Sequence, residues 1–248
     1  MRDVLILGSS GEVGSAIRKV IEKSKLYRVS LLDKVGVKEL RSKKFDVMHV
    51  CIPYDDDFID DVADYMFTYK PQLTLIESTV KPKTTSSLYE LTKLPICHSP
   101  VRGRHTEGIE NGFFTYTKFI GSPRREFALE AEKYYNSLGL KAYICNSSEE
   151  TEFMKLLETT YYGLLIAFAQ EVRRICNKFG LNENDINAFF NTETIESGYK
   201  HMLPVKYPGV ISGHCVIANA MILKEVFPSK FIDAMLDSNE RRIREVQK

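Results

Sequence analysis

Residues 3–33, DVLILGSSGEVGSAIRKVIEKSKLYRVSLLD, decide the fold. The stretch begins with a short apolar run, passes through a glycine-rich segment into a helical pattern, and closes with a second apolar run. A strand, a glycine-rich turn, a helix and a second strand in this order begin a doubly wound α/β fold. Glycines in the turn allow another molecule to approach the backbone closely.

The glycine segment predicts a dinucleotide site. Its glycines are spaced GxxGxxG, one residue longer than the common GxGxxG, and they open a helix whose unpaired N–H groups attract a pyrophosphate. Asp33 follows Gly14 by 19 residues, at the end of the second strand, where a carboxylate bonds both ribose hydroxyls and repels a 2′-phosphate. We therefore expect NAD rather than NADP. The neighbouring Lys34 weakens this preference, because a lysine can bind the 2′-phosphate of NADP. The residues expected to bind the cofactor are Gly8, Ser10, Gly11, Glu12, Val13, Gly14, Asp33, Lys34, Ile52, Pro53 and Thr79.

The composition excludes several classes of protein. With 44% hydrophobic and 27% charged residues, the 248-residue chain has the make-up of an ordinary soluble domain. A net charge of +1 gives no field that favours nucleic acid or a membrane surface, and no apolar run is long enough to span a membrane. The N-terminus lacks a secretory signal pattern, and the five cysteines are scattered without a CxxC pair. We expect a cytoplasmic protein with free thiols and no metal site.

Strand and helix patterns alternate through the first half of the chain. They predict a Rossmann-type, doubly wound and mainly parallel sheet with helices on both faces. Besides strands at 3–7 and 28–32 and a helix at 124–138, strands are expected at 45–53, 72–79, 94–100, 118–123 and 140–146.

The rest of the chain is expected to be helical. Residues 151–180 form one long helical pattern closed by Gly180 as a C-cap, and a shorter capped helix follows at 181–193. A loop-like stretch at 200–215 precedes a last helical region that begins at Val216.

These patterns predict two domains, an NAD-binding Rossmann domain at 1–148 and a smaller all-helical domain at 149–248. The long helix is apolar over most of its circumference between residues 153 and 176, which favours burial against a partner. We therefore expect a homodimer formed through the 152–178 helix.

Two predicted strand ends carry basic segments, ESTVKPKTT at 77–85 and CHSPVRGRHTEG at 97–108. Because ligands of open α/β sheets bind beyond the carboxyl ends of the strands, these cations favour a small anionic substrate. Arg102, Arg104 and His105 are the expected substrate-binding residues of this region. Solvated surface charge is the alternative interpretation.

Four segments resemble the UDP-glucose/GDP-mannose dehydrogenase family. Residues 77–85 resemble its STV-P-x-T segment and residues 97–108 its SPER-containing loop. Residues 151–181, TEFMKLLETTYYGLLIAFAQEVRRICNKFGL, resemble the start of its central helical domain. PGVISGHCVIANA at 208–220 resembles its PGVGGHC segment with one extra residue. The resemblance implies NAD-dependent oxidation of a nucleotide-sugar primary alcohol to the acid, through a thiohemiacetal and then a thioester on a cysteine.

The resemblance also assigns roles to single residues. Cys215 matches the nucleophilic cysteine, Lys155 the lysine that assists proton transfer or stabilises an oxyanion, and Thr79 the threonine that positions water. A thiolate suits the first role because it is a strong nucleophile and a good leaving group. The alternatives are a buried thiol at Cys215 and a lysine that reaches solvent from the helix edge at Lys155. Gly213 and His214, next to the cysteine, are expected to contact substrate, and His214 either tunes the thiol or packs.

The sequence departs from the family pattern at three positions. Thr159 stands where the family has Asn, Asn219 where it has Asp, and Val101 where it has the SPER glutamate. Asp and Glu act as bases, whereas Asn and Val do not. The expected catalytic set is therefore incomplete: Cys215, Lys155, Thr79, Asn219 and Thr159. The family also carries a further nucleotide-binding domain, so this chain, which ends at Lys248, is expected to be either a fragment or a naturally short relative.

Three functions follow from these observations. The first is an NAD-dependent dehydrogenase related to nucleotide-sugar dehydrogenases, which stops at the aldehyde or continues to the acid through Cys215. The second is a two-electron β-hydroxyacid-type dehydrogenase, which shares the layout of a Rossmann domain followed by a helical domain with a lysine on its first long helix. The third is a non-catalytic NAD-binding protein derived from such an enzyme. The glycine segment alone also fits a tight βα turn that binds nothing.

Overall fold

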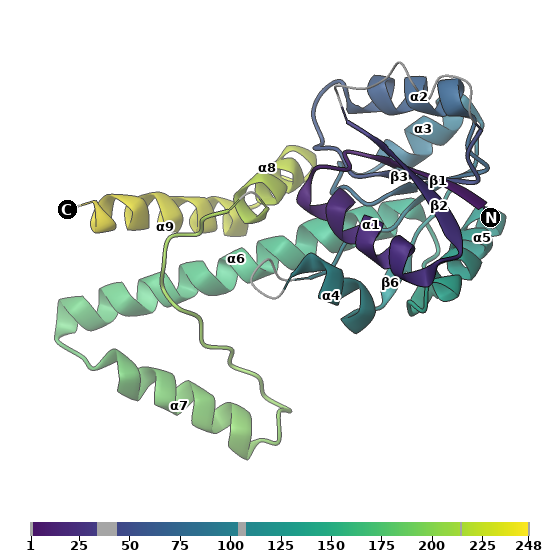
Figure 1. Ribbon diagram of the computed structural model, residues 1–248. Helices are drawn as coiled ribbons and strands as arrows, with labels where there is room; N and C mark the ends of the chain where they lie inside the picture. Colours follow the sequence, from purple (N-terminus) through teal and green to yellow (C-terminus); the bar gives the residue numbers. More distant parts are fainter. Residues whose placement is uncertain (1, 34–43, 104–107, 214, 248) are drawn as a thin grey trace. The chain divides into compact units, whose positions relative to one another are not determined.

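The computed structural model describes residues 2–33, 44–103, 108–213 and 215–247, and it divides into two compact units. The first unit is Met1–Lys155 and the second is Leu156–Lys248 (Figure 1). The helix that joins them starts at Ser148 and runs through the division, so the expected boundary at 148/149 stays a prediction.

The first unit is built from alternating strands and helices, as the sequence pattern predicts. All seven expected strands are present, and helices lie between most consecutive strands. The elements are β1 (Arg2–Leu7), α1 (Glu12–Ser24), β2 (Tyr27–Leu32), β3 (Val47–Val50), α2 (Phe58–Tyr69), β4 (Leu73–Ile76), α3 (Thr84–Thr92), β5 (Ile96–His98), α4 (Ile109–Thr115), β6 (Lys118–Ile120), α5 (Arg125–Ser137) and β7 (Ala142–Ile144).

Five of these strands form one parallel sheet in the order β2-β1-β3-β4-β5. Figure 1 shows the strands side by side with helices packed against them. The strand order reverses between β1 and β3, and ligands of such sheets bind at that reversal, beyond the carboxyl ends of the strands. The glycine segment after β1 and residues Cys51–Pro53 after β3 therefore lie where a ligand is expected.

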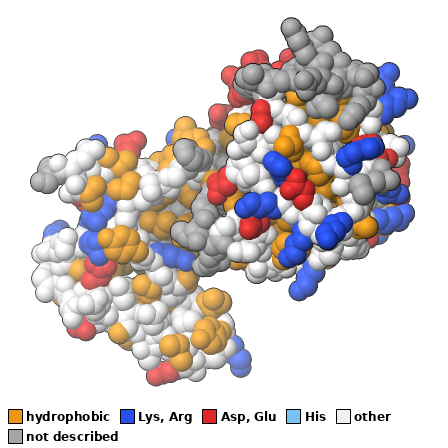
Figure 2. All heavy atoms as spheres, viewed as in Figure 1, with side chains coloured by type: hydrophobic (Ala, Val, Ile, Leu, Met, Phe, Trp, Pro, Cys, Tyr) orange, Lys and Arg blue, Asp and Glu red, His pale blue; other side chains and the backbone are white. Residues whose placement is uncertain are grey.

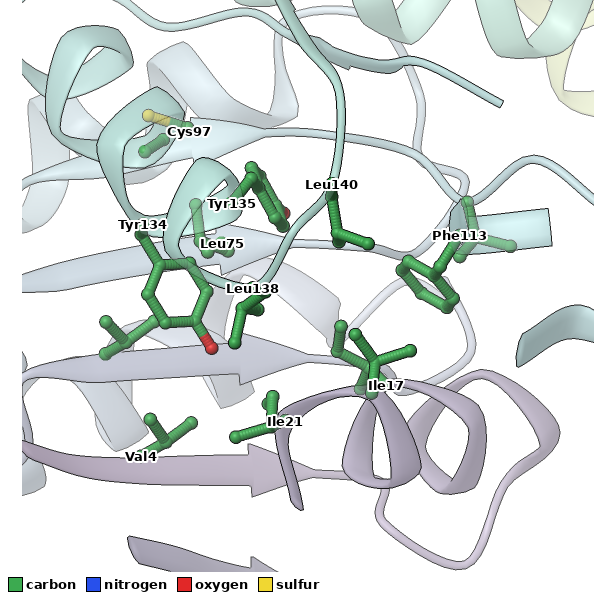
Figure 3. Close-up of a cluster of buried hydrophobic side chains, with 14 of the residues drawn as sticks. Val4, Ile17, Ile21, Leu75, Cys97, Phe113, Tyr134, Tyr135, Leu138 and Leu140 are labelled. Atoms are coloured by element: carbon green, nitrogen blue, oxygen red, sulfur yellow. The ribbon is translucent and has the colours of Figure 1, made fainter. Parts of the chain in front are cut away.

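Side chains of β1 alternate between two hydrophobic cores, one on each face of the sheet. Val4 and Ile6 pack with buried residues of α1, α4 and α5 in the first core, and Figure 3 shows part of this cluster. Leu5 and Leu7 pack with residues of α2 and α3 in the second core. All four side chains are at most 1% exposed, and burial of each stabilises the fold by about 2 kcal/mol. The fold is therefore doubly wound, as expected.

β6 and β7 form a separate two-stranded parallel sheet. An antiparallel bridge joins them to the main sheet, in which His98 and Gly121 exchange backbone hydrogen bonds of 2.8 and 2.9 Å. Gly121 is required there because a β-carbon would overlap the backbone oxygen of Ser147. The sequence pattern predicts both strands but not their separation from the main sheet.

A buried ion pair connects β6 to the end of β4. Lys118 Nζ lies 2.6 Å from Glu77 Oε2, and both side chains are at most 3% exposed. Glu77 also accepts a hydrogen bond of 2.8 Å from Tyr135 and pairs with His49 at 3.1 Å. Burial alone would raise the pKa of Glu77, but the charge of Lys118 and the hydrogen bond from His49 lower this pKa to about 2. The polar groups thus satisfy one another inside an apolar core.

The second unit consists of helices, as expected. Most of α6 (Ser148–Phe179) belongs to it, followed by α7 (Glu183–Glu196), α8 (Val216–Val226) and α9 (Lys230–Val246). Gly180, at φ +66°, ends α6 in the left-handed conformation that its position predicts. The expected helical region from Val216 consists of two helices, because Pro228 interrupts it. The side chain of Ser229 then caps α9 by accepting a hydrogen bond from the Phe231 amide. No helix of the described ranges is long and apolar enough to cross a membrane.

Candidate functional site

The glycine turn after β1 has the geometry of a close-approach site. Gly8 has φ +76° and donates a backbone hydrogen bond of 2.9 Å to Leu32 at the end of β2. A β-carbon at Gly14 would overlap the Gly8 backbone oxygen, so only glycine lets α1 start this close to the turn. Gly11 is the N-cap residue and makes no side-chain cap hydrogen bond, and the N-terminus of a helix at such a turn attracts an anionic ligand. Glu12 and Val13, predicted to bind cofactor, begin this helix.

Asp33 lies beside the same turn. Its Oδ2 accepts hydrogen bonds from the Ser9 and Ser10 hydroxyls at 2.7 and 2.6 Å, and its Oδ1 accepts from the Ser10 amide at 3.1 Å. Partial burial alone would raise the pKa of Asp33, but the hydrogen bonds from Ser10 and Ser9 lower this pKa below its usual value. The structure therefore places Asp33, as an ionised carboxylate, next to the glycine turn. The sequence interpretation did not include Ser9.

The ends of β3 and β4 lie together at the same edge of the sheet. Ser78 Oγ donates a hydrogen bond of 2.6 Å to the backbone oxygen of Ile52. Ile52 and Thr79 are half-buried, whereas Pro53 is exposed. These three predicted cofactor residues thus follow neighbouring strands of the sheet.

Only one of the predicted substrate cations can be placed. Arg102 lies with its guanidinium 5.3 Å from the ring centroid of Tyr116 and 5.6 Å from that of Phe119. Such stacking against two aromatic rings holds the guanidinium in place. Arg104 and His105 lie outside the described residues, as do Lys34 and His214.

Lys155 lies in the first unit, half-buried on α6, close to the end of β5. Burial lowers the pKa of His98 to about 3, and the nearby charges of Lys118 and Lys155 contribute to this shift. The His98 ring is therefore neutral. Its Nε2 lies 3.1 Å from the Ser78 backbone oxygen, which can only accept, so Nε2 carries the proton. Lys155 and the residue before Thr79 are thus neighbours of one histidine ring.

Glu152 is a site residue that sequence reasoning missed. Its carboxylate is fully buried and accepts hydrogen bonds from the Lys83 amide (2.6 Å), the Thr85 amide (2.8 Å) and the Thr85 hydroxyl (2.6 Å). Burial raises the pKa of Glu152 to about 7, although the hydrogen bonds from Thr85 and Lys83 oppose this shift. A glutamate one turn before Lys155 in an apolar helical pattern was the signal that could have identified it.

Cys215 lies in the second unit, half-buried, as the N-cap residue of α8. Gly213, two residues earlier, has φ +94° and is exposed, a conformation that favours glycine. None of the five cysteines, Cys51, Cys97, Cys145, Cys176 and Cys215, forms a disulfide in the part of the chain that the structure describes.

Two predicted catalytic residues of the second unit contact each other. Asn219 Nδ2 donates a hydrogen bond of 3.1 Å to Thr159 Oγ1, which itself donates to the Leu156 backbone oxygen at 3.1 Å. The Asn219 amide also donates to the Cys215 backbone oxygen at 2.9 Å. Thr159 and Asn219 are two of the positions at which the chain departs from the family pattern. Together they form an uncharged pair that cannot act as a general base.

No group of three or more metal-binding side chains is present among the described residues. The geometry of the first unit instead fits a dinucleotide, with a close-approach glycine turn, an uncapped helix N-terminus and an ionised carboxylate at the end of the neighbouring strand.

Comparison with known proteins gives the family. Residues 149–241 match the model of the UDP-glucose/GDP-mannose dehydrogenase family, central domain. The chain is 30% identical over 212 residues to the UDP-N-acetyl-D-mannosamine dehydrogenase of Methanococcus maripaludis, a match that covers 82% of this chain and 45% of that protein.

Two solved structures share the fold. The UDP-D-ManNAc dehydrogenase from Pyrococcus horikoshii has a TM-score of 0.81 and 20% identity, with 97% of this chain and 68% of that chain covered. The Mycobacterium tuberculosis 3-hydroxyisobutyrate dehydrogenase has a TM-score of 0.73 and 13% identity, with 100% and 94% covered.

The chain spans about half the length of the curated relatives it matches. The family match includes Lys155 and Cys215, and the relatives also align with most of the first unit. On these matches, the chain belongs to the UDP-glucose/GDP-mannose dehydrogenase family.

Proposed function

We propose that this chain binds NAD and oxidises the primary alcohol of an anionic, sugar-type substrate. The observation that carries the proposal is Asp33, an ionised carboxylate held 2.6–2.7 Å from the serine hydroxyls of the glycine turn. A carboxylate at this point of a doubly wound sheet receives the ribose hydroxyls and repels a 2′-phosphate, which favours NAD over NADP. The relatives named above, UDP-N-acetyl-D-mannosamine dehydrogenases, suggest a UDP-N-acetyl sugar as the first substrate to try.

The residues of the first unit would hold the cofactor. Gly8, Gly11 and Gly14 would admit the pyrophosphate at the start of α1, and Asp33 would receive the ribose. NAD, when bound, supplies the hydride acceptor for each oxidation. Lys155, half-buried beside the neutral His98, would take the alcohol proton or stabilise the oxyanion that forms.

Cys215 would carry the second half of a four-electron oxidation. Its thiolate would add to the carbonyl carbon of the aldehyde, which forms an S–C bond and places a negative charge on the oxygen. Loss of a hydride from this alkoxide adduct, with bound NAD as the hydride acceptor, would give the thioester. Water would then break its S–C bond, release the acid and return the thiol. Thr159 and Asn219 cannot act as the base of that hydrolysis, so a two-electron oxidation that ends at the aldehyde is the simpler form of the proposal.

Cofactor titrations and turnover assays test the proposal. We expect NADH to bind more tightly than NADPH, and a UDP-N-acetyl sugar to produce NADH. The same assay with a series of β-hydroxyacids tests the alternative of a β-hydroxyacid-type dehydrogenase, which is supported only by the shared fold. Absence of turnover with every alcohol, combined with tight NADH binding, would support the non-catalytic alternative instead. Trapping of an aldehyde by Cys215, absent in Cys215→Ser, would separate the four-electron from the two-electron reaction.

We also propose that the chain forms a homodimer through α6. Large hydrophobic side chains of the second unit are exposed, among them Tyr161 (60%), Phe168 (61%) and Phe189 (72%). Figure 2 shows hydrophobic side chains on the surface of this unit. Tyr161 and Phe168 also line an apolar pocket of about 340 Å³ between α6, α7 and residues 202–206. Exposed apolar area of this kind is typical of a protein interface, and a monomer in light scattering would contradict the proposal.

A further inference from the structure

The segment that carries Thr79 needs support from outside itself. Residues 77–83, which join β4 to α3 and are called the β4–α3 segment below, end in Lys83 with φ +79°. A non-glycine residue in the left-handed region is strained, by about 1 kcal/mol or more. Lys83 is also the N-cap residue of α3, and its own side chain does not cap the helix. Both the strain and the unpaired N–H groups require a partner from elsewhere in the fold.

Glu152 of α6 is that partner at the end of the segment. Its carboxylate accepts from the amides of Lys83 and Thr85 and from the Thr85 hydroxyl, all within 2.8 Å. It therefore caps α3 across 67 to 69 residues of chain. A fully buried carboxylate is retained only where such hydrogen bonds compensate for its lost hydration.

His98 holds the start of the same segment. Its Nε2–H donates to the Ser78 backbone oxygen, which belongs to the peptide bond that leads into Thr79. The other ring nitrogen, Nδ1, accepts from the Thr151 hydroxyl at 2.8 Å. Thr151 and Glu152 are consecutive residues in the first turns of α6 and are both fully buried. Adjacent side chains of one helix thus support the two ends of the β4–α3 segment.

Lys155 follows these two residues by one helical turn. Side chains three and four positions apart in a helix lie on the same face, so Lys155 shares a face with Glu152 and Thr151. All of these residues belong to the first unit. The face of α6 that fixes the β4–α3 segment is therefore the face that presents Lys155.

We infer that Glu152 is a positioning residue, which keeps the Thr79-bearing segment in register with Lys155 during the oxidation. The inference rests on the proposed function. Gln at position 152 would turn an N–H group toward one of the donating amides, because a carboxamide has only one acceptor atom. We expect Glu152→Gln to lower kcat by about tenfold or more, since small misplacements of reacting groups carry costs of this size. NADH affinity should fall by less than kcat does, because Thr79 is only one of the residues expected to bind cofactor, and the glycine turn and Asp33 belong to other segments.

The test combines turnover with amide hydrogen exchange. Glu152→Gln and Thr85→Ala should lower kcat and speed exchange of the Lys83 and Thr85 amides. Thr85→Ser retains the hydroxyl and should restore both values. Glu149→Gln, which removes a charge from the same helical turn, is the matched control and should leave kcat and exchange unchanged.

The outcomes are distinct. The inference is wrong if Glu152→Gln matches Glu149→Gln in kcat, or if the Lys83 and Thr85 amides exchange at the wild-type rate. Thr85→Ala is the milder variant and decides the matter if Glu152→Gln does not fold. If the wild-type chain oxidises no alcohol, the proposed function is wrong, and Glu152 then has no role in turnover. Unchanged exchange in an active enzyme would instead overturn the inference alone.

Discussion

Replacement of Glu77 by Gln should destabilise the protein through the buried ammonium of Lys118. In the wild type, Lys118 Nζ lies 2.6 Å from Glu77 Oε2 and 2.5 Å from the Ser99 backbone oxygen. Gln retains a hydrogen-bond acceptor but not the negative charge, so the ammonium remains buried without a counter-ion. Removal of one partner of a buried pair costs about 4 kcal/mol, and for a unit of this size that corresponds to a fall in Tm of about 10 °C.

A double-mutant cycle separates the charge effect from the loss of packing. Lys118→Met removes the ammonium and keeps most of the side-chain volume, so Glu77→Gln/Lys118→Met should recover about 2 kcal/mol relative to the sum of the single changes. Urea unfolding followed by far-UV circular dichroism measures these differences, since the chain contains no tryptophan. A loss below about 1 kcal/mol for Glu77→Gln, or strict additivity in the cycle, would refute the view that this pair is a coupled, desolvated unit.

Four further outcomes follow from the structure. Asp33→Asn should weaken NADH binding about tenfold and bring the NADH and NADPH affinities together, because the carboxylate no longer repels a 2′-phosphate; unchanged selectivity in a fluorescence titration would contradict this. Gly14→Ala should cost about 3 kcal/mol in urea unfolding and abolish NADH binding, because its methyl group overlaps the Gly8 oxygen; wild-type stability would show that the turn adjusts. The difference in free energy of unfolding between wild type and His98→Gln should narrow by about 2 kcal/mol as the pH falls from 6.5 to 5. The reason is that the pKa of His98 is about 3 in the folded state, below its unfolded value, so the stability that neutral His98 contributes is lost as the pH falls. The difference in free energy of unfolding between wild type and Glu152→Gln should instead widen as the pH falls over this range, because the pKa of Glu152 is raised to about 7 in the folded state. If the unfolding free energies of a variant and the wild type change with pH in parallel, the pKa shift of that residue is contradicted.

The local pattern predicts the strands and the parallel, doubly wound sheet of the first unit, but not the separation of β6 and β7 from the main sheet. The apolar runs and the glycine turn in residues 3–33 specify β1, α1 and β2 through contacts that are close in sequence. The same alternation predicts the later strands, although expected ranges such as 45–53 and 72–79 are longer than β3 (Val47–Val50) and β4 (Leu73–Ile76). The period of residues 151–180 likewise predicts α6, which the structure extends by three residues to Ser148 because polar side chains cap its first turn.

Contacts between distant residues could not be predicted in this way. Glu152 reaches Thr85 across 67 residues, and Lys118 reaches Glu77 across 41. In the sequence, Lys118 looks like an ordinary surface lysine of a short strand, because a single side chain does not show which partner lies opposite it. The same holds for the contact of Thr159 with Asn219, which becomes visible only when α6 and α8 are placed. Charge partners of this kind depend on tertiary packing rather than on periodicity.

The hydrogen bonds between Asp33 and the two serines have a consequence for ligand exchange. A carboxylate has about four acceptor positions, and the Ser9 hydroxyl, the Ser10 hydroxyl and the Ser10 amide already use three of them at Asp33. A ribose that binds Asp33 therefore competes with a group of the same chain, which is present at a high effective concentration. The turn thus contains its own competitor for the acid. This competition lowers the affinity for the nucleotide. It also speeds dissociation, because the serine groups rebind Asp33 as the ribose leaves, and it therefore favours rapid exchange of oxidised for reduced cofactor.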